Sequence, residues 1–151
     1  MASRSCSQVR AALYDTSGPV QFAVAGEFGA IAASGRPRAD DEGLARQSTE
    51  RREGAMLVNL TTRRIDDVLL SSGSPREIDY LSVDVEGAEL EVMEAFPFKT
   101  HIAYVITVEH NQDELRRTQL RELMLAHGYT FLGQLKWDDV FTYKSLHGLA
   151  V

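Results

Sequence analysis

The chain has 151 residues, of which 44% are hydrophobic and 25% charged, and its formal net charge is −6. These values predict one soluble globular domain over residues 1–151 and argue against nucleic acid or an anionic membrane as a partner. The single cysteine excludes an internal disulfide, and we expect a cytoplasmic protein because no stretch resembles a membrane span or a signal peptide.

The first part of the chain predicts short strands joined by turns. Residues 9–13 and 20–24 are apolar or alternating, and residues 15–18 between them have the composition of a turn. Residues 26–29 are rich in glycine, but no helical pattern follows them, so we interpret them as a turn and not as a phosphate-binding loop. Residues 35–54 are small, charged and aperiodic, which predicts a mobile loop. Its arginines could hold an anionic substrate or simply face solvent.

A short strand and a helix are expected next. Residues 56–60 form an apolar run, and either of the two threonines that follow could cap a helix. The inner face of that helix would carry Ile65, Val68 and Leu69. Residues 71–75 read as a linker.

Residues 78–111 carry the most informative pattern of the sequence. Residues 78–83 are apolar in a way that predicts a strand buried on both faces. A polar turn follows, and then apolar residues recur at helical spacing until Pro97 ends the helix. A second buried strand is expected over residues 103–108. The apolar helix positions are Leu90, Met93 and Phe96, and the positions expected to face solvent are Glu89, Glu91 and Glu94.

A strand–helix–strand unit places its two strands parallel, so their carboxyl ends meet at one edge of the sheet. Asp84, Glu86 and Glu109 follow these two ends and should line a crevice. Asp84 is our first candidate for orienting or deprotonating a hydroxyl group, although it could equally cap the helix. Glu86 and Glu109 could hold hydroxyl groups or, with Asp84, a hard cation, but the pattern is not diagnostic of a metal. His110 could act as a base or be a surface histidine.

The last part of the sequence predicts a helix and a β-hairpin. Asn111 could cap the helix, with Glu114 completing a capping box, and Gly128 would end it. Residues 129–135 and 140–143 should then pair as a hairpin. The apolar helix face would carry Leu115, Leu120, Leu123, Met124 and His127, and the solvent face Arg116, Arg117 and Arg121.

Several of these segments resemble the FkbM family of S-adenosylmethionine-dependent methyltransferases. The resemblance rests on IDYLSVDVEGAELEV followed by ITVEHN, since the family shows an apolar strand ending in D-x-E-G-x-E, a short helix, and a strand ending in E-x-N. The segments TTRRIDDVLL and AALYDTSGPVQFAVAGEFG resemble further parts of the family pattern. The resemblance implies an α/β, Rossmann-like class I methyltransferase fold, with a mostly parallel sheet that ends in a C-terminal antiparallel hairpin.

The resemblance also implies a site and a reaction. It places Leu13, Asp15 and Asp84 near S-adenosylmethionine, although Asp15 could be only a turn residue. The reaction would be methylation of a hydroxyl group on a small molecule or glycan, with Asp84, Glu86, Glu109 and His110 as candidate catalytic residues and no dedicated metal site.

The family's first strand, glycine-rich turn and ribose-binding acid have no counterpart in this sequence. We therefore expect a sheet that is incomplete at its N-terminal side, with the central strand exposed at an edge. The chain would then be a fragment, a mis-started gene product or a decayed domain. The alternative function is that of a non-catalytic module which binds a partner through this edge or through the arginine-containing loop.

Overall fold

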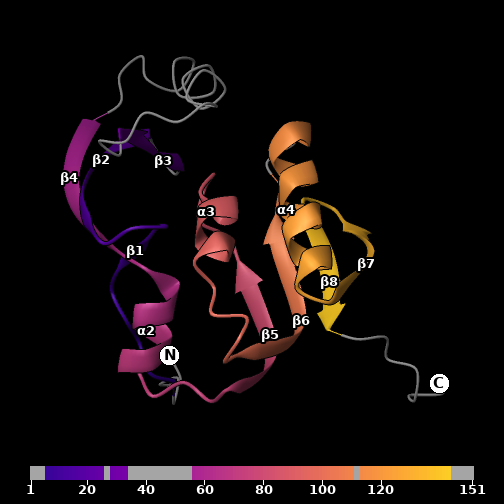
Figure 1. Cartoon of the computed structure of the whole chain (residues 1–151). Coiled ribbons are helices and arrows are strands. Elements are labelled where there is room, and N and C mark those ends of the chain that lie inside the picture. The colour runs from indigo at the N-terminus through magenta and orange to yellow at the C-terminus, as the bar shows by residue number, and fades with distance from the viewer. Residues whose placement is uncertain (1–5, 26–27, 34–55, 111–112, 144–151) are drawn as a thin grey trace, which may run out of the picture.

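The computed structural model describes residues 6–25, 28–33, 56–110 and 113–143, and for residues 23–25 and 28–33 it describes only the backbone. These residues form two four-stranded sheets and three helices (Figure 1), so the predicted α/β class is confirmed. The predicted loop over residues 35–54 lies outside the described residues. Within the described residues, no helix is both long enough and apolar enough to cross a lipid bilayer.

The first sheet has the order β1 (Ala12–Leu13), β4 (Met56–Arg63), β2 (Gly18–Ala25) and β3 (Phe28–Ala33). β2 pairs antiparallel with both β3 and β4, and β1 pairs parallel with β4. β3 begins at Phe28, inside residues 26–29, which we had interpreted as a turn, and residues 26–27 lie outside the described residues. β4 is longer than the predicted run and includes both threonines, so neither of them caps a helix.

Thr62 is buried and stabilises a turn of the first sheet. Its hydroxyl group donates to the carbonyl oxygens of Thr16 and Gly18, at 2.6 and 3.0 Å. This fixes the turn between β1 and β2 against β4. The helix α2 (Ile65–Ser71) begins only after Arg64, and Ile65 is buried as predicted.

The second sheet has the order β5 (Glu77–Val83), β6 (Ile102–Glu109), β8 (Asp138–Tyr143) and β7 (Tyr129–Leu135). β5 and β6 are parallel and are joined by α3 (Glu89–Glu94), as the sequence predicts. The predicted C-terminal antiparallel hairpin is β7 and β8.

The prediction of a mostly parallel sheet is not confirmed. In the part of the chain that the structure describes, parallel pairing joins only β1 with β4 and β5 with β6, and the other four pairings are antiparallel. β5 lies at the edge of its sheet, where we expected the central strand to be exposed.

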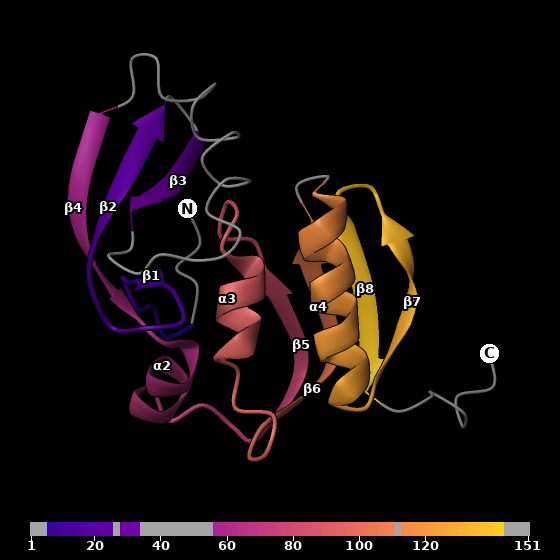
Figure 2. The same cartoon turned by 45° about the horizontal axis from the view of Figure 1, so that its top comes forward.

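The helices α3 and α4 (Glu114–Ala126) lie side by side on one face of the second sheet (Figure 2). Their apolar side chains pack with Val83, Ile106 and Phe141 from the strands, and Ile65 of α2 joins the same core. Burial of such a side chain stabilises the fold by about 1.5–3 kcal/mol. Because the helices cover one face, most of β5 is exposed or half-buried, and the prediction of a strand buried on both faces is wrong.

Three predictions about α4 are also wrong. The N-cap residue is Asp113 and not Asn111, because its carboxylate accepts from the backbone N–H groups of Leu115 and Arg116, both at 3.1 Å. Leu115 is exposed and does not belong to an apolar face. The arginines expected to face solvent are partly buried, and two of them, Arg117 and Arg121, bind the carboxylate of Asp139, which is 0% exposed.

Candidate active site

Two consecutive residues in the turn between β5 and α3 have positive φ, although only one of them is glycine. Glu86 and Gly87 both have positive φ, at 58° and 104°. Glycine adopts such angles without strain, and a β-carbon at Gly87 would meet nothing within 4 Å. Glycine is therefore favoured at position 87 because of its positive φ, and not because a side chain would clash with neighbouring atoms. The result is a sharp turn that carries Asp84 and Glu86 at the carboxyl end of β5.

Glu89 holds this turn in place. Its Oε1 accepts from the backbone N–H groups of Val85 and Gly87, at 3.1 and 2.9 Å, and the residue is only 5% exposed. The N-cap residue of α3, Ala88, offers no side-chain acceptor, so Glu89 satisfies backbone donors that the cap leaves open. The prediction that Glu89 lies on a solvent-facing side of the helix is wrong.

Arg116 supports the same turn from α4. Its Nη2 donates to the carbonyl oxygen of Gly87 at 3.3 Å and also to the carboxylate of Glu91. Glu91 is 2% exposed, so its predicted place on the solvent face is wrong as well, whereas Glu94 is exposed as predicted. A buried carboxylate is stable only with such a partner. Arg116 therefore ties the turn and α3 to α4.

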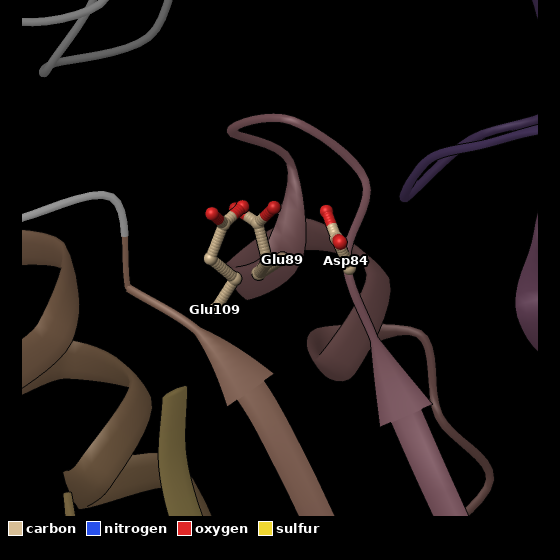
Figure 3. Close-up of side chains that lie close together, drawn as sticks. All are labelled: Asp84, Glu89 and Glu109. Carbon is tan, nitrogen blue, oxygen red and sulfur yellow. The ribbon is translucent and has the colours of Figure 1, made fainter. Parts of the chain in front are cut away.

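Three carboxyl groups meet above the ends of β5 and β6 (Figure 3). Asp84, Glu89 and Glu109 each have an oxygen within 4.8 Å of an oxygen of the other two. The register explains the pairing of Asp84 with Glu109, because Val83 lies opposite Val108 in the parallel ladder. The sequence predicts that Asp84 and Glu109 lie together, but it does not predict Glu89 as the third member.

The electrostatics of this cluster are dominated by burial and by like charges. Burial raises the pKa of Glu109 to about 7, with the carboxylates of Asp84, Glu89 and Glu86 and a hydrogen bond from the protonated Glu109 to Asp84 adding to the effect. Burial also raises the pKa of Glu89, against the opposing effect of its backbone hydrogen bonds and of Arg116. Glu109 can therefore gain or lose a proton near neutral pH.

The other predicted site residues have separate positions. Glu86 is half-buried in the turn and lies outside the group of three, although its charge acts on Glu109. His110 is buried and is not the surface histidine that we considered. Its backbone N–H donates to the carbonyl oxygen of Trp137 at 3.0 Å, which joins the end of β6 to the turn between β7 and β8.

Leu13 lies in β1 and Asp15 in the turn after it, and neither joins the cluster. Leu13 packs against the core that α2, α3 and the second sheet share. The carboxylate of Asp15 accepts from the hydroxyl group of Thr16 at 3.1 Å, and its carbonyl oxygen accepts from Arg64 at 2.6 Å. These contacts fit the turn role that we considered for Asp15.

The arrangement can bind groups that donate hydrogen bonds or carry positive charge. A carboxylate accepts up to about four hydrogen bonds, and a protonated carboxyl also donates one. Clusters of carboxylate oxygens also suit hard cations, but neighbouring acids are common without one. The residues that the sequence did not predict are Glu89 and Arg116. Glu89 is the last acid of the D-x-E-G-x-E pattern, which marks the residue but not its burial, whereas nothing local marks Arg116.

Comparisons with known proteins place this site in a family. The model of the methyltransferase FkbM domain matches residues 1–131 of the chain. A search of curated proteins and a search of solved structures each found no match. The matched residues include the turn after β5, the end of β6, and all three members of the carboxyl cluster. The chain therefore belongs to the FkbM methyltransferase family.

Proposed function

We propose that this chain transfers a methyl group from S-adenosylmethionine to a hydroxyl oxygen of a small molecule or glycan. The observation that carries the proposal is the contact between Asp84 and Glu109 at the ends of two adjacent parallel strands. Ligands of open α/β folds bind at this edge. Bound S-adenosylmethionine would supply an electrophilic methyl group on a positively charged sulfur, and a cluster of carboxyl groups suits a positive charge.

Glu109 is the base in this proposal. A hydroxyl acceptor loses its proton as its oxygen bonds to the methyl carbon, and a base works best when its pKa lies near the working pH. The pKa of Glu109, raised to about 7 by burial and by its acidic neighbours, meets this condition. Asp84 is exposed and close to Glu109, so it can accept a hydrogen bond from the same acceptor molecule and orient it.

Glu89 and Arg116 have a positioning role. Glu89 binds the backbone of the turn that carries Asp84, and Arg116 binds the carbonyl oxygen of Gly87 within it. Neither residue needs to touch the acceptor. Both fix the distance between the two strand-end carboxyl groups, on which alignment of the reacting atoms depends.

Calorimetric titration of the purified 151-residue chain with S-adenosylmethionine tests the proposal. We expect heat of binding, and no heat at millimolar cofactor would exclude an active enzyme in this form. With an acceptor in hand, Glu109→Gln should lower kcat by about 10²–10⁴-fold, the usual contribution of general-base catalysis. The matched control is Glu122→Gln, which changes an exposed carboxyl group on α4 and should leave kcat unchanged.

A further inference from the structure

Three strongly exposed apolar residues lie at one end of the second sheet. They are Leu115, Leu135 and Trp137, whose exposed fractions are 63%, 61% and 57%. Leu115 belongs to the first turn of α4, and the other two flank Lys136 where β7 turns into β8. This is the end toward which β5 and β6 run (Figure 2), so the apolar residues and the carboxyl ends of these strands share one end of the sheet.

A series of hydrogen bonds joins the start of α4 to the turn between β7 and β8. The backbone N–H of His110 donates to the carbonyl oxygen of Trp137, and the N–H of Asp113 donates to the carbonyl oxygen of His110, both at 3.0 Å. The carboxylate of Asp113 then accepts from the N–H of Leu115 at 3.1 Å. The three apolar residues therefore lie on adjoining segments, and we call the surface that they form the apolar end.

Polar side chains from α4 and from both strands hold the turn in place. Gln134 Nε2 donates to the carbonyl oxygen of Lys136 at 2.7 Å, and Gln134 Oε1 accepts from Arg117 at 2.8 Å. Arg117 is bound in turn by the carboxylate of Asp139, which is 0% exposed. The backbone of the turn is thus fixed without any contact from its apolar side chains. A preformed turn loses little conformational entropy when it docks on a partner.

The size and chemistry of the apolar end favour a lipid interface over a protein partner. Its three side chains offer roughly 350 Å² of apolar surface, whereas a stable protein interface buries about 800 Å² on each partner. A few apolar side chains are enough for interfacial binding to a membrane, because each one removed from water adds to the affinity. Tryptophan is enriched at membrane–water interfaces, since its ring is apolar and its N–H can bind polar headgroups. The stem of Lys136 can lie along the lipid while its ammonium group stays among the phosphates.

We propose that the apolar end docks the protein on the surface of a membrane of zwitterionic phospholipid. Charge selects this class of lipid, because the chain has a net charge of −6 and the same end carries the exposed carboxyl groups of Asp84 and Glu114. An anionic surface would repel these groups. Docking by this end brings the carboxyl ends of β5 and β6 to the membrane side of the molecule, and it needs neither cofactor nor methyl transfer.

Tryptophan fluorescence tests the docking, because the chain contains one tryptophan and the emission reports on Trp137 alone. The chain is mixed with vesicles of phosphatidylcholine, and separately with vesicles of phosphatidylcholine whose acyl chains are brominated. We expect the first to shift the emission to the blue and the second to quench it, since the indole enters the interface. Replacement of about a third of the lipid by phosphatidylserine should weaken the binding.

Substitutions at exposed positions separate docking from a general effect on the protein. Leu135→Ala and Trp137→Ala should each lower the vesicle partition coefficient, measured by co-sedimentation, by about tenfold. The control is Leu70→Ala, which removes an 80% exposed leucine from α2 and should leave the partition coefficient unchanged.

Several results would overturn the proposal. Brominated lipid could leave the emission unquenched, or binding could occur only with phosphatidylserine in the vesicles. Trp137→Ala could partition as the wild type does, or Leu70→Ala could lose as much binding as Trp137→Ala. A blue shift that appears on raising the protein concentration without vesicles would mean that a second copy of the chain covers the apolar end, and this too would reject the lipid partner.

Discussion

Replacement of Glu109 by glutamine should increase the free energy of unfolding at pH 8 and have much less effect at pH 5. Burial and the carboxylates around it raise the pKa of Glu109 from 4.5 to about 7. The folded state therefore favours the protonated carboxyl. The contribution of this protonated carboxyl to the free energy of unfolding is fully present below pH 4.5. It is lost as the pH rises through about 7, because the folded protein must then carry the buried charge.

The size of the effect follows from the two pKa values. A pKa of about 7 in place of 4.5 corresponds to about 3.4 kcal/mol at high pH, at about 1.36 kcal/mol per pH unit. Glu109 is partly exposed, so solvent screening reduces this figure, and we expect about 1–2 kcal/mol. Glu109→Gln keeps the shape of the protonated side chain and cannot become charged. The variant should therefore exceed the wild type in free energy of unfolding by about this amount at pH 8.

Urea denaturation of both proteins at pH 5 and pH 8 measures this difference. At pH 5 the difference should be much smaller than at pH 8, because pH 5 lies only slightly above the unfolded-state pKa of 4.5 and most of the loss occurs between pH 5 and about 7. Glu122→Gln, at an exposed position on α4, should change little at either pH. Equal stability of Glu109→Gln and wild type at pH 8, or an equal gain at both pH values, would refute the reasoning.

Three further substitutions test the contacts around the site. Asp84→Asn should lower the pKa of Glu109, because a neighbouring carboxylate is removed, and ¹³C NMR titration of the glutamate carboxyl groups would show an unchanged pKa if this coupling were absent. Arg116→Met leaves the carboxylate of Glu91 buried without its arginine, so unfolding in urea should show a loss of about 3–5 kcal/mol, and a loss below about 1 kcal/mol would contradict the assigned pair. Asp139→Ala removes the shared partner of two α4 arginines and should cost about 3 kcal/mol by the same measurement, whereas a stability within about 0.5 kcal/mol of the wild type would mean that solvent replaces the pair.

The central strand–helix–strand unit could be predicted because its hydrophobic period changes twice within a short span. Residues 78–83 and 103–108 read as strands, and β5 and β6 contain them. A parallel register then places the residues after both strands together, so Asp84 and Glu109 follow from sequence alone. The C-terminal hairpin was predictable for a similar local reason, since two strand-like runs flank a short polar turn.

The burial of Glu89 and Glu91 could not be predicted from the local sequence pattern. Glu89 and Glu91 lie between the apolar residues of a short helix, which is the usual sign of a solvent-facing side. Their burial depends on the backbone of the preceding turn for Glu89 and on Arg116, a residue of another helix, for Glu91. The exposed face of β5 has the same origin, because helix packing on one face of a sheet is decided by tertiary contacts.

The N-cap residue of α4 could not be predicted because two nearby residues are suited to that position. Asn111 and Asp113 are both good N-cap residues, and helix boundaries predicted from such signals are uncertain by a few positions. The structure begins the helix after Asp113, which accepts two backbone hydrogen bonds.

The stability cost at the carboxyl cluster is itself an argument for function. A fold selected only for stability would not crowd Asp84, Glu89 and Glu109 within 4.8 Å of one another, since like charges at this distance oppose folding. Glu89 has a structural reason to be there, because it binds the turn. The raised pKa of Glu109, by contrast, weakens the fold at neutral pH and above. A carboxyl group kept at that cost, at the edge where ligands of such sheets bind, supports the proposed role in which Glu109 takes a proton from the acceptor.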